Sequence, residues 1–127
     1  MNISKKSQYG LRAMVFLAKK YKFKKPVSLK EISEKENIPF MFLEKIVSKL
    51  EKAMLVKGKK GLRGGYVLSK SPQKITAKDI VEVLEETQSV NCFLCSKRLE
   101  CASKNVWAKV DLAINKALKS VKLSNLI

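Results

Sequence analysis

The feature that most constrains the fold is a pair of short amphipathic segments separated by a two-residue break. Ser28 and Glu31 have the spacing of a capping box, which predicts a helix over residues 28–36. Asn37 begins an expected tight turn, and Pro39 suits the first turn of a following helix. The apolar residues of that next helix follow the i, i+3, i+4, i+7 rule: Leu43, Ile46, Val47, Leu50 and Met54. Two helices joined by a tight turn predict a helix-turn-helix.

The stretch after these helices, LVKGKKGLRGGYVLSK, predicts a β-hairpin. Two short β-like runs, residues 55–57 and residues 65–68, flank a loop with three glycines and three cations, and Gly65 and Lys57 at its ends bring each count to four. A basic hairpin beside a helix-turn-helix is a wing. The predicted fold class is mainly α: a winged helix-turn-helix with a small β-hairpin wing and a long C-terminal helix, which the family resemblance given below makes a dimerisation helix.

Helical patterns flank this unit on both sides. Residues 7–21, SQYGLRAMVFLAKKY, predict a largely buried first helix with cations at its C-terminal end. Thr76 and Asp79 predict a capped start for a helix after the hairpin. A further helix is expected from about residue 103. Its apolar residues are spaced 3, 4, 3 and 4 apart, like the a and d positions of a heptad: Trp107, Val110, Ile114, Ala117 and Val121.

We expect a single domain over residues 1–127, made of three parts. Residues 1–72 form the winged helix-turn-helix, residues 73–102 a connecting helix and a cysteine loop, and residues 103–127 a dimerisation helix and tail. The terminal apolar stripe covers about two and a half heptads, which also suits a helix that packs into its own domain's core. The spacing alone therefore leaves dimerisation open.

The charge of the chain is strongly positive and unevenly distributed. The net charge is +16, whereas surfaces that only need to stay soluble carry a magnitude of about 2 to 8. Residues 1–70 hold 18 basic and 5 acidic side chains, a net +13, and residues 71–127 hold 9 and 6, a net +3. This asymmetry predicts a polyanionic partner for the N-terminal half. A lysine-rich surface due to genome bias or thermal adaptation is the alternative, because 24 Lys stand against 3 Arg.

The longest apolar run, AMVFLA at residues 13–18, is far shorter than the roughly 20 residues of a membrane-spanning helix. The N-terminus also lacks the long apolar core of a signal peptide. We therefore expect a cytoplasmic protein without a membrane partner, whose thiols stay reduced.

The outward face of the third helix holds the candidate base-reading residues. In helix-turn-helix proteins the second helix of the pair lies in the major groove. A glutamate such as Glu44 accepts a hydrogen bond from cytosine, and the cations of the wing reach a minor groove or phosphates. Any solvated helix face has a similar composition, so the assignment depends on the co-occurrence of helix pair, wing and basic half. The DNA-binding candidates are Ser28, Met41, Glu44, Lys45, Ser48, Lys60 and Arg63.

All three cysteines of the chain, Cys92, Cys95 and Cys101, stand in the stretch NCFLCSKRLEC, and the chain has no histidine. Three readings are open: a soft-metal or cluster site, a thiol redox switch, and structural thiols that fill a core. Clustering on one polar loop favours the first. A zinc site would need a fourth donor, which cannot be histidine.

Four stretches of the sequence resemble the Rrf-type winged-helix transcriptional regulators. They are the opening ISKKSQYGLRAM, the helix PFMFLEKIVSKLEKAMLVK, the wing GLRGGYVLSK and the VNC start of the cysteine loop. These regulators are the IscR/NsrR-like iron-sulfur sensor family, and the opening and the VNC junction look closest to the nitric-oxide-sensing branch. The resemblance runs from Met1 to about Leu126. It implies a homodimer, held by the C-terminal helix, on a palindromic operator in double-stranded DNA. It also implies that Glu44 reads bases and that Lys60 is the basic wing residue.

The resemblance further implies that Cys92, Cys95 and Cys101 hold an iron-sulfur cluster, either [2Fe-2S] or [4Fe-4S]. The C-x2-C spacing is tighter than is usual in the family, although the C-x5-C spacing matches. Both positions that supply the family's fourth ligand differ, since this chain has Lys104 and Gln8 there. The fourth donor would then be a carboxylate, water, a small molecule, or an amide oxygen such as that of Gln8.

The expected function is a homodimeric DNA-binding regulator, a repressor, modulated by a cluster that senses redox state or nitric oxide. The alternative within this class has no cluster and senses thiol oxidation or a protein partner. A small electron carrier would need a fully ligated cluster, which three cysteines and the +16 charge argue against. An enzyme is not expected, because the chain lacks a histidine base, a Gly-rich phosphate loop and a recognisable carboxylate pair. RNA is not expected as a partner, because a structural RNA-binding protein would not need the cysteines.

Overall fold

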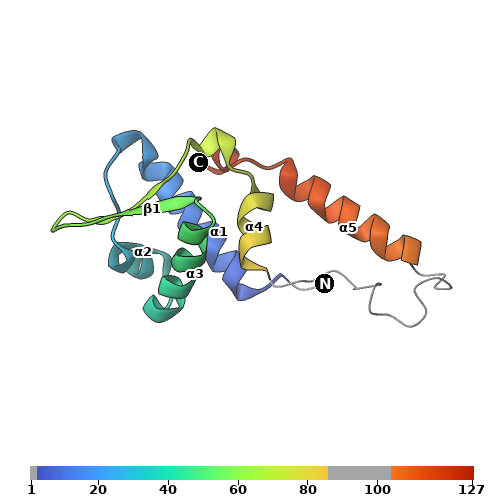
Figure 1. The fold of residues 1–127 in the computed structure, drawn as a ribbon, viewed down its shortest axis with the longest axis horizontal. Coiled ribbons are helices and arrows are strands. Elements are labelled where there is room, and N and C mark those ends of the chain that lie inside the picture. The colour runs from blue at the N-terminus through green and yellow to red at the C-terminus, as the bar shows by residue number, and fades with distance from the viewer. Residues whose placement is uncertain (1–2, 86–103) are drawn as a thin grey trace.

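The computed structural model describes residues 3–85 and 104–127 of the chain. Its helices and its one two-stranded sheet confirm the predicted winged helix-turn-helix (Figure 1). Short 3-10 helices connect the longer elements. In chain order the elements are α1 (Lys5–Lys20), η1 (Tyr21–Phe23), α2 (Leu29–Glu36), α3 (Phe40–Lys52), β1 (Val56–Lys59), β2 (Gly65–Leu68), η2 (Pro72–Lys74), α4 (Ala77–Leu84), α5 (Lys104–Lys119) and η3 (Leu123–Leu126).

Helix α1 is the central element of the fold and begins two residues earlier than predicted. Ser4 caps its N-terminus, because the Ser4 hydroxyl oxygen accepts a hydrogen bond from the Ser7 N–H at 3.3 Å. Lys19 and Lys20 end the helix, where cations complement the helix dipole. The buried residues of α1 are Ser7, Gly10, Ala13, Met14, Phe16, Leu17 and Ala18.

Helices α2 and α3 form the predicted helix-turn-helix. The Ser28 hydroxyl accepts a hydrogen bond from the Glu31 N–H at 3.1 Å, which is the first half of the predicted capping box. The Glu31 carboxylate lies 3.4 Å from Lys35 Nζ. Asn37 closes α2 in the left-handed region at φ 57°, which asparagine tolerates better than most residues. Pro39 is the N-cap of α3, one position before the first turn.

The sequence pattern places Met54 on the apolar face of α3, and this prediction is wrong. The helix ends at Lys52, and Met54 follows it with φ 64° and an exposed fraction of 77%. The Leu55 N–H donates to the Leu50 carbonyl at 3.0 Å, which turns the chain toward β1. Leu55, exposed by only 5%, contributes the apolar side chain to the core in place of Met54.

The hairpin pairs Val56 with Leu68 and Lys59 with Gly65, so β1 begins and ends later than predicted while β2 matches. The segment before α2 pairs with the free edge of β2. The Val27 N–H donates to the Tyr66 carbonyl at 3.0 Å, and the Tyr66 N–H donates to the Val27 carbonyl at 2.8 Å. At Gly65 (φ 155°) a Cβ would lie 2.4 Å from the Val27 carbonyl oxygen, so this close approach requires glycine.

Helix α4 starts with a complete capping box between Thr76 and Asp79, as predicted. Helix α5 extends away from the body on the side opposite the hairpin (Figure 1). Val121, predicted as the last residue of the stripe on this helix, lies beyond the helix end, so that part of the prediction is wrong. The Val121 carbonyl accepts a hydrogen bond from the Ala77 N–H at 2.8 Å, and this pairing directs Leu123 into the core.

One hydrophobic core joins α1, α2, α3, α4, the hairpin and Leu123. The three-part division of the chain stays a prediction. No helix within the described ranges, residues 3–85 and 104–127, is long and apolar enough to cross a lipid bilayer.

Candidate nucleic-acid interface

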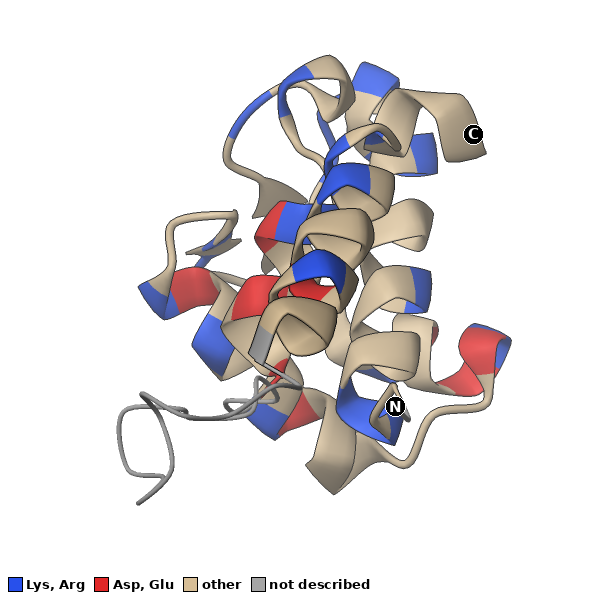
Figure 2. Cartoon of the chain, turned by 90° about the vertical axis from the view of Figure 1, so that its right-hand side faces the viewer, with Lys and Arg blue, Asp and Glu red and all other residues tan. Residues whose placement is uncertain are grey.

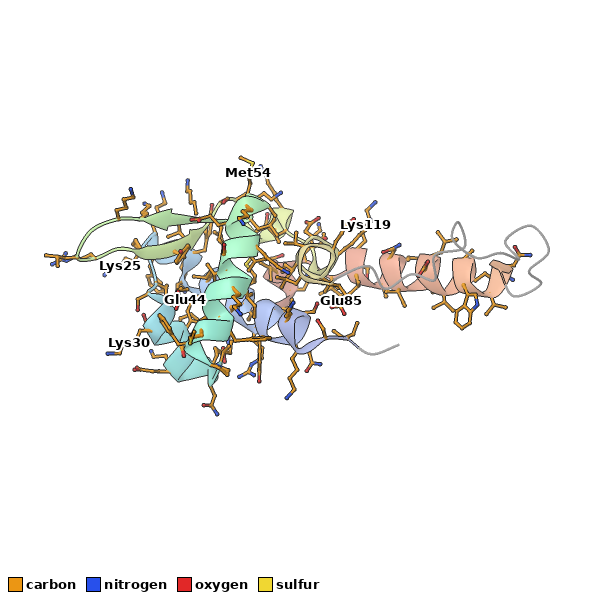
Figure 3. All side chains as sticks on the ribbon, turned by 60° about the horizontal axis from the view of Figure 1, so that its bottom comes forward. Lys25, Lys30, Glu44, Met54, Glu85 and Lys119 are labelled. Atoms are coloured by element: carbon orange, nitrogen blue, oxygen red, sulfur yellow. The ribbon has the colours of Figure 1, made fainter. Side chains whose placement is uncertain are left out.

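Helix α3 presents a polar face to solvent and an apolar face to the core. Leu43, Ile46, Val47 and Leu50 are buried, whereas Met41 is 75% exposed. Glu44, which Figure 3 labels on this helix, is exposed together with its neighbour Lys45. Ser48 lies one turn further on and is also exposed. The four residues predicted to face outward on α3 therefore do so.

Glu44 differs from most acidic side chains of the N-terminal half in having its carboxylate uncommitted. Glu31 forms an ion pair with Lys35, and Glu36 forms one with Arg12. The Glu51 carboxylate accepts a hydrogen bond from the Gly58 N–H at 3.1 Å. Within the described part of the chain, Glu44 takes part in no hydrogen bond or ion pair. An exposed carboxylate on a basic helix face can accept a hydrogen bond from a base amino group.

A groove of about 430 Å³ runs beside this face, between α3 and the start of α1. Glu44, Lys45 and Ser48 line it together with Lys49 and Lys52. Leu84 at the end of α4 closes its other side. The outward face of α3 is thus bordered by cations along its length.

Contacts between side chains hold α3 against α1 and α2. The Tyr9 ring meets the Phe42 ring edge-on, with centroids 5.5 Å apart and planes at 85°. Arg12 lies over the Tyr9 ring at 5.8 Å and donates a hydrogen bond to the Glu36 carbonyl at the end of α2. Because these contacts join three helices, they fix the direction in which the base-reading face of α3 points.

The wing carries its cations at an exposed tip. Lys60 and Arg63 are exposed, and the Gly64 N–H donates to the Gly61 carbonyl at 2.9 Å to close the turn between them. Leu62, between the two, is fully exposed at 109%. The sequence alone assigns no role to Leu62, since a single exposed leucine carries no signal. A tip of this kind offers two cations and one apolar side chain to a partner.

Two further features of this surface are not evident from the sequence. Phe40, the first residue of α3, is 45% exposed beside Met41, so the N-terminus of the helix is more apolar than its polar face. Lys30 in the first turn of α2 is exposed on the same side of the molecule (Figure 3).

Ser28, a predicted DNA contact, lies exposed one residue before α2, where its hydroxyl oxygen caps the helix. Figure 2 shows basic residues on helices and loops alike rather than in one band.

The predicted cluster ligands Cys92, Cys95 and Cys101 lie outside the described residues. Gln8, the suggested amide donor, is exposed on α1, and its Nε2 donates to the Ile3 carbonyl at 3.0 Å. Among residues 3–85 and 104–127, no three side chains of metal-binding type lie together. Three thiolates form a donor set that suits an iron-sulfur or other soft-metal site, so the residues present fit the group that the resemblance implies.

The start of α1 is bonded to the end of α4, close in sequence to the cysteines. The Ser4 N–H and hydroxyl donate to the Glu85 carboxylate at 3.1 and 2.9 Å, and the buried Ser7 hydroxyl also donates to it. Burial raises the pKa of the Glu85 carboxyl. The hydrogen bonds from Ser7 and Ser4 and the charge of Lys6 lower it by more than burial raises it, so the pKa lies below its ordinary value.

Helix α5 leaves part of its predicted stripe uncovered. Trp107 is 41% exposed and Ala117 is exposed, whereas Val110 and Ile114 are half-buried. Helix α4 packs against this helix. The described residues therefore cover the middle of this stripe and leave Trp107 and Ala117 open.

Comparison with known proteins decides the family. Residues 3–127 match the Rrf2 model, described as an iron-dependent transcriptional regulator. The chain belongs to the Rrf2 family. It is 41% identical to the HTH-type transcriptional regulator CymR of Bacillus subtilis, over 99% of this chain and 89% of the relative. Membership makes the chain a DNA-binding transcriptional regulator and not an enzyme.

Solved structures of Rrf2 proteins share the fold. The structure of CymR, described as the global cysteine regulator of B. subtilis, superposes with a TM-score of 0.85 at 40% identity. That match covers 99% of this chain and 95% of the other. IscR from T. potens gives a TM-score of 0.83 at 35% identity, over 99% of this chain and 85% of the other. The chain is thus related to both CymR and IscR.

Proposed function

We propose that this Rrf2 protein is a homodimeric repressor that binds a palindromic operator in double-stranded DNA. The observation that carries the proposal is the uncommitted Glu44 carboxylate on the exposed face of α3, beside a wing whose tip carries Lys60 and Arg63. Helix α3 enters the major groove, where Glu44 accepts a hydrogen bond from a cytosine amino group. Lys45 and Ser48 contact neighbouring bases or phosphates, and Met41 offers an apolar surface to a thymine methyl group.

The wing and the N-terminus of α2 position the protein on the backbone. Lys60 and Arg63 contact phosphates or enter the adjacent minor groove. The Ser28 O–H donates a hydrogen bond to a phosphate, while its oxygen accepts the Glu31 N–H and caps α2. Phosphate contacts supply affinity and register but no sequence information. Specificity therefore depends on α3 and affinity on the wing.

The dimer forms through the part of the stripe on α5 that the described residues leave uncovered, where Trp107 is exposed. Aromatic residues are enriched among the side chains that dominate interfaces. A two-fold symmetric dimer presents two copies of α3, which explains why the operator should be a palindrome with half-sites one or two helical turns apart. The protein acts on DNA in the cytoplasm, and its charge of +16 suits this partner.

We further propose that Cys92, Cys95 and Cys101 hold an iron-sulfur cluster through their thiolates. Because the fourth ligand is not a cysteine, the iron of a bound cluster would be open to nitric oxide or oxygen. A sensor requires such reactivity. The description of the family as iron-dependent and the similarity to IscR support this proposal. Cys92 follows Glu85 by seven residues, so a change at the cysteines has a short covalent path to the Ser4–Glu85 contact and hence to α1.

The alternative is a regulator that senses through thiol oxidation or a protein partner. The similarity to a protein described as a global cysteine regulator favours this alternative. Anaerobic purification separates the two, because a cluster gives charge-transfer absorption in the visible range. Chemical reconstitution of wild type and of each Cys→Ser variant should then show iron and sulfide only in wild type. If the wild-type protein is colourless and contains no iron, the cluster proposal fails and the alternative without a cluster stands.

The DNA proposal is tested by fluorescence anisotropy with duplex fragments of the protein's own genome, the matching single strands and the matching RNA. Specific protein–DNA affinity exceeds non-specific affinity by about 10³ or more. We expect one or a few duplex fragments to bind this much more tightly than the rest. Equal affinity for all duplexes, or tighter binding of RNA or single strands, would contradict the proposal.

A further inference from the structure

A second concave site lies away from the face that α3 presents to DNA. It has a volume of about 200 Å³ and lies between the end of α1, residues 24–27 and the base of the hairpin. Leu17 and Val27 contribute apolar walls, and Tyr21 and the Tyr66 part of β2 also line the site. It is smaller than the pockets of about 300–1,000 Å³ that hold drug-sized ligands. Its size suits a small ligand.

The charged residues that line this pocket are all cations. They are five lysines: Lys20, Lys24, Lys25, Lys57 and Lys59. Three come from the end of α1 and the following loop, and two come from β1, so chain segments far apart in sequence bring them together. Neither salt bridge between described residues involves any of the five. Like charges gathered in a concavity repel one another, and a bound anion would relieve this repulsion.

Backbone geometry holds the lysines in place. Lys24 has φ 54°, in the left-handed region, and its N–H donates to the Tyr21 carbonyl at 3.0 Å. A non-glycine residue in this region is strained and persists there only where its surroundings hold it. Two residues after Lys25, the backbone of Val27 pairs with Tyr66 through two hydrogen bonds. The loop that carries Lys24 and Lys25 is therefore tied to the hairpin that carries the other lysines.

The pocket faces away from the recognition helix. A Cβ at Gly58 would lie 3.1 Å from Glu51 of α3, so that face of β1 points toward α3. Side chains alternate along a strand, so Lys57 and Lys59 lie on the opposite face. Figure 3 places Lys25 beside the hairpin, and Glu44 is not among the residues that line the pocket. A ligand in this pocket would not stand between α3 and a DNA groove.

We propose that this pocket binds a small anion with one or two phosphate groups. Lysine ammonium groups bind phosphate as point charges, and five of them on three chain segments can surround such a ligand. Because Lys59 is adjacent to Lys60 at the start of the wing tip, a bound anion links the wing to the end of α1.

Pyrophosphate is the probe that tests this site. Isothermal titration of pyrophosphate into the full chain at physiological salt should show one saturable site per chain. The double variant Lys24→Gln/Lys57→Gln removes one cation from each wall and should weaken binding about tenfold or more, since hydrogen bonds to charged groups are strong. The control Lys74→Gln/Lys119→Gln makes the same change in net charge at exposed positions outside the pocket, and should change affinity by less than about twofold.

The titration is repeated with the protein saturated by duplex DNA. We expect pyrophosphate to bind the complex as well, because the pocket lies off the α3 face. Displacement of pyrophosphate by duplex would assign the pocket to the DNA backbone and overturn the small-ligand proposal. Absence of saturable binding, or equal weakening in both double variants, would also overturn it. The titration of the free protein is independent of the proposed DNA function, so the two can fail separately.

Discussion

Ser4 and Glu85 are joined by two hydrogen bonds across 81 positions of sequence, through the Ser4 N–H at 3.1 Å and the Ser4 hydroxyl at 2.9 Å. The same Ser4 hydroxyl caps α1 by accepting the Ser7 N–H. One side chain therefore fixes both the first turn of α1 and the end of α4. Since α1 also contacts α2 and α3 through Arg12 and Tyr9, this bond connects the end of α4, from which the chain continues to the cysteines, to the DNA-reading helix.

Replacement of Glu85 by glutamine should lower the free energy of unfolding by about 1 kcal/mol. Hydrogen bonds to a charged acceptor contribute about 1.5–3 kcal/mol when buried, and solvent screening reduces this for a half-buried carboxylate. Denaturant unfolding of Glu85→Gln and of the control Glu82→Gln, an exposed residue on α4, measures the effect. If both variants reduced stability equally, the Ser4–Glu85 contact would not be the cause.

The contribution of Glu85 should also depend on pH. Its pKa is lower in the folded chain than the ordinary value of 4.5, so the contribution is complete above that value and is lost as pH falls through the folded pKa. The stability difference between wild type and Glu85→Gln should therefore shrink as the pH is lowered from about 5 toward about 3. Unfolding curves at several pH values measure this; a difference that grew on acidification would mean that the pKa shift has the opposite sign.

Removal of either wing cation should weaken DNA binding without changing base preference. For every phosphate that the variant no longer contacts, the slope of log affinity against log salt should fall by about one unit. Anisotropy titrations of Lys60→Ala and Arg63→Ala over a range of salt test this, with Lys119→Ala at the end of α5 as the control (Figure 3). An unchanged slope for both wing variants would show that the tip does not touch phosphate.

Disruption of the uncovered part of the stripe on α5 should separate the dimer. Trp107→Lys places a charge on the predicted stripe and should raise the dimer dissociation constant about tenfold or more, because buried tryptophans often contribute about 2 kcal/mol to an interface. Leu112→Lys is the matched control, since Leu112 is 70% exposed on the same helix but lies off the stripe. Sedimentation equilibrium measures both. Dissociation by Leu112→Lys alone would place the interface on another face.

Local patterns in the sequence predict most of the elements. The 3.6-residue spacing locates α3, and capping residues locate the starts of α2 and α4, because these signals act within one or two turns. The errors occur where a helix ends. Met54 and Val121 continue the apolar spacing in sequence, but the backbone leaves the helix before each one, and backbone pairing to Leu50 or Ala77 determines where.

The orientation of the site is predictable from sequence, whereas its supports are not. Glu44, Lys45 and Ser48 face outward because the apolar stripe fixes the rotation of α3. The contacts that aim this helix have no local signal, since Arg12, Tyr9 and Phe42 meet only in the folded chain. The lysine pocket is similar: its two walls are separated by more than thirty residues in sequence, and no local pattern relates Lys24 to Lys57.

The central claim, that α3 reads bases through Glu44 in a symmetric dimer, is tested most directly by selection from a random duplex library with wild type and Glu44→Ala. Wild type should enrich a palindrome with half-sites one or two helical turns apart. Glu44→Ala should keep the palindrome and lose the preference at one position in each half-site, at a cost of about 1–3 kcal/mol there. No palindrome for wild type, or an unchanged preference at every position for Glu44→Ala, would contradict the claim.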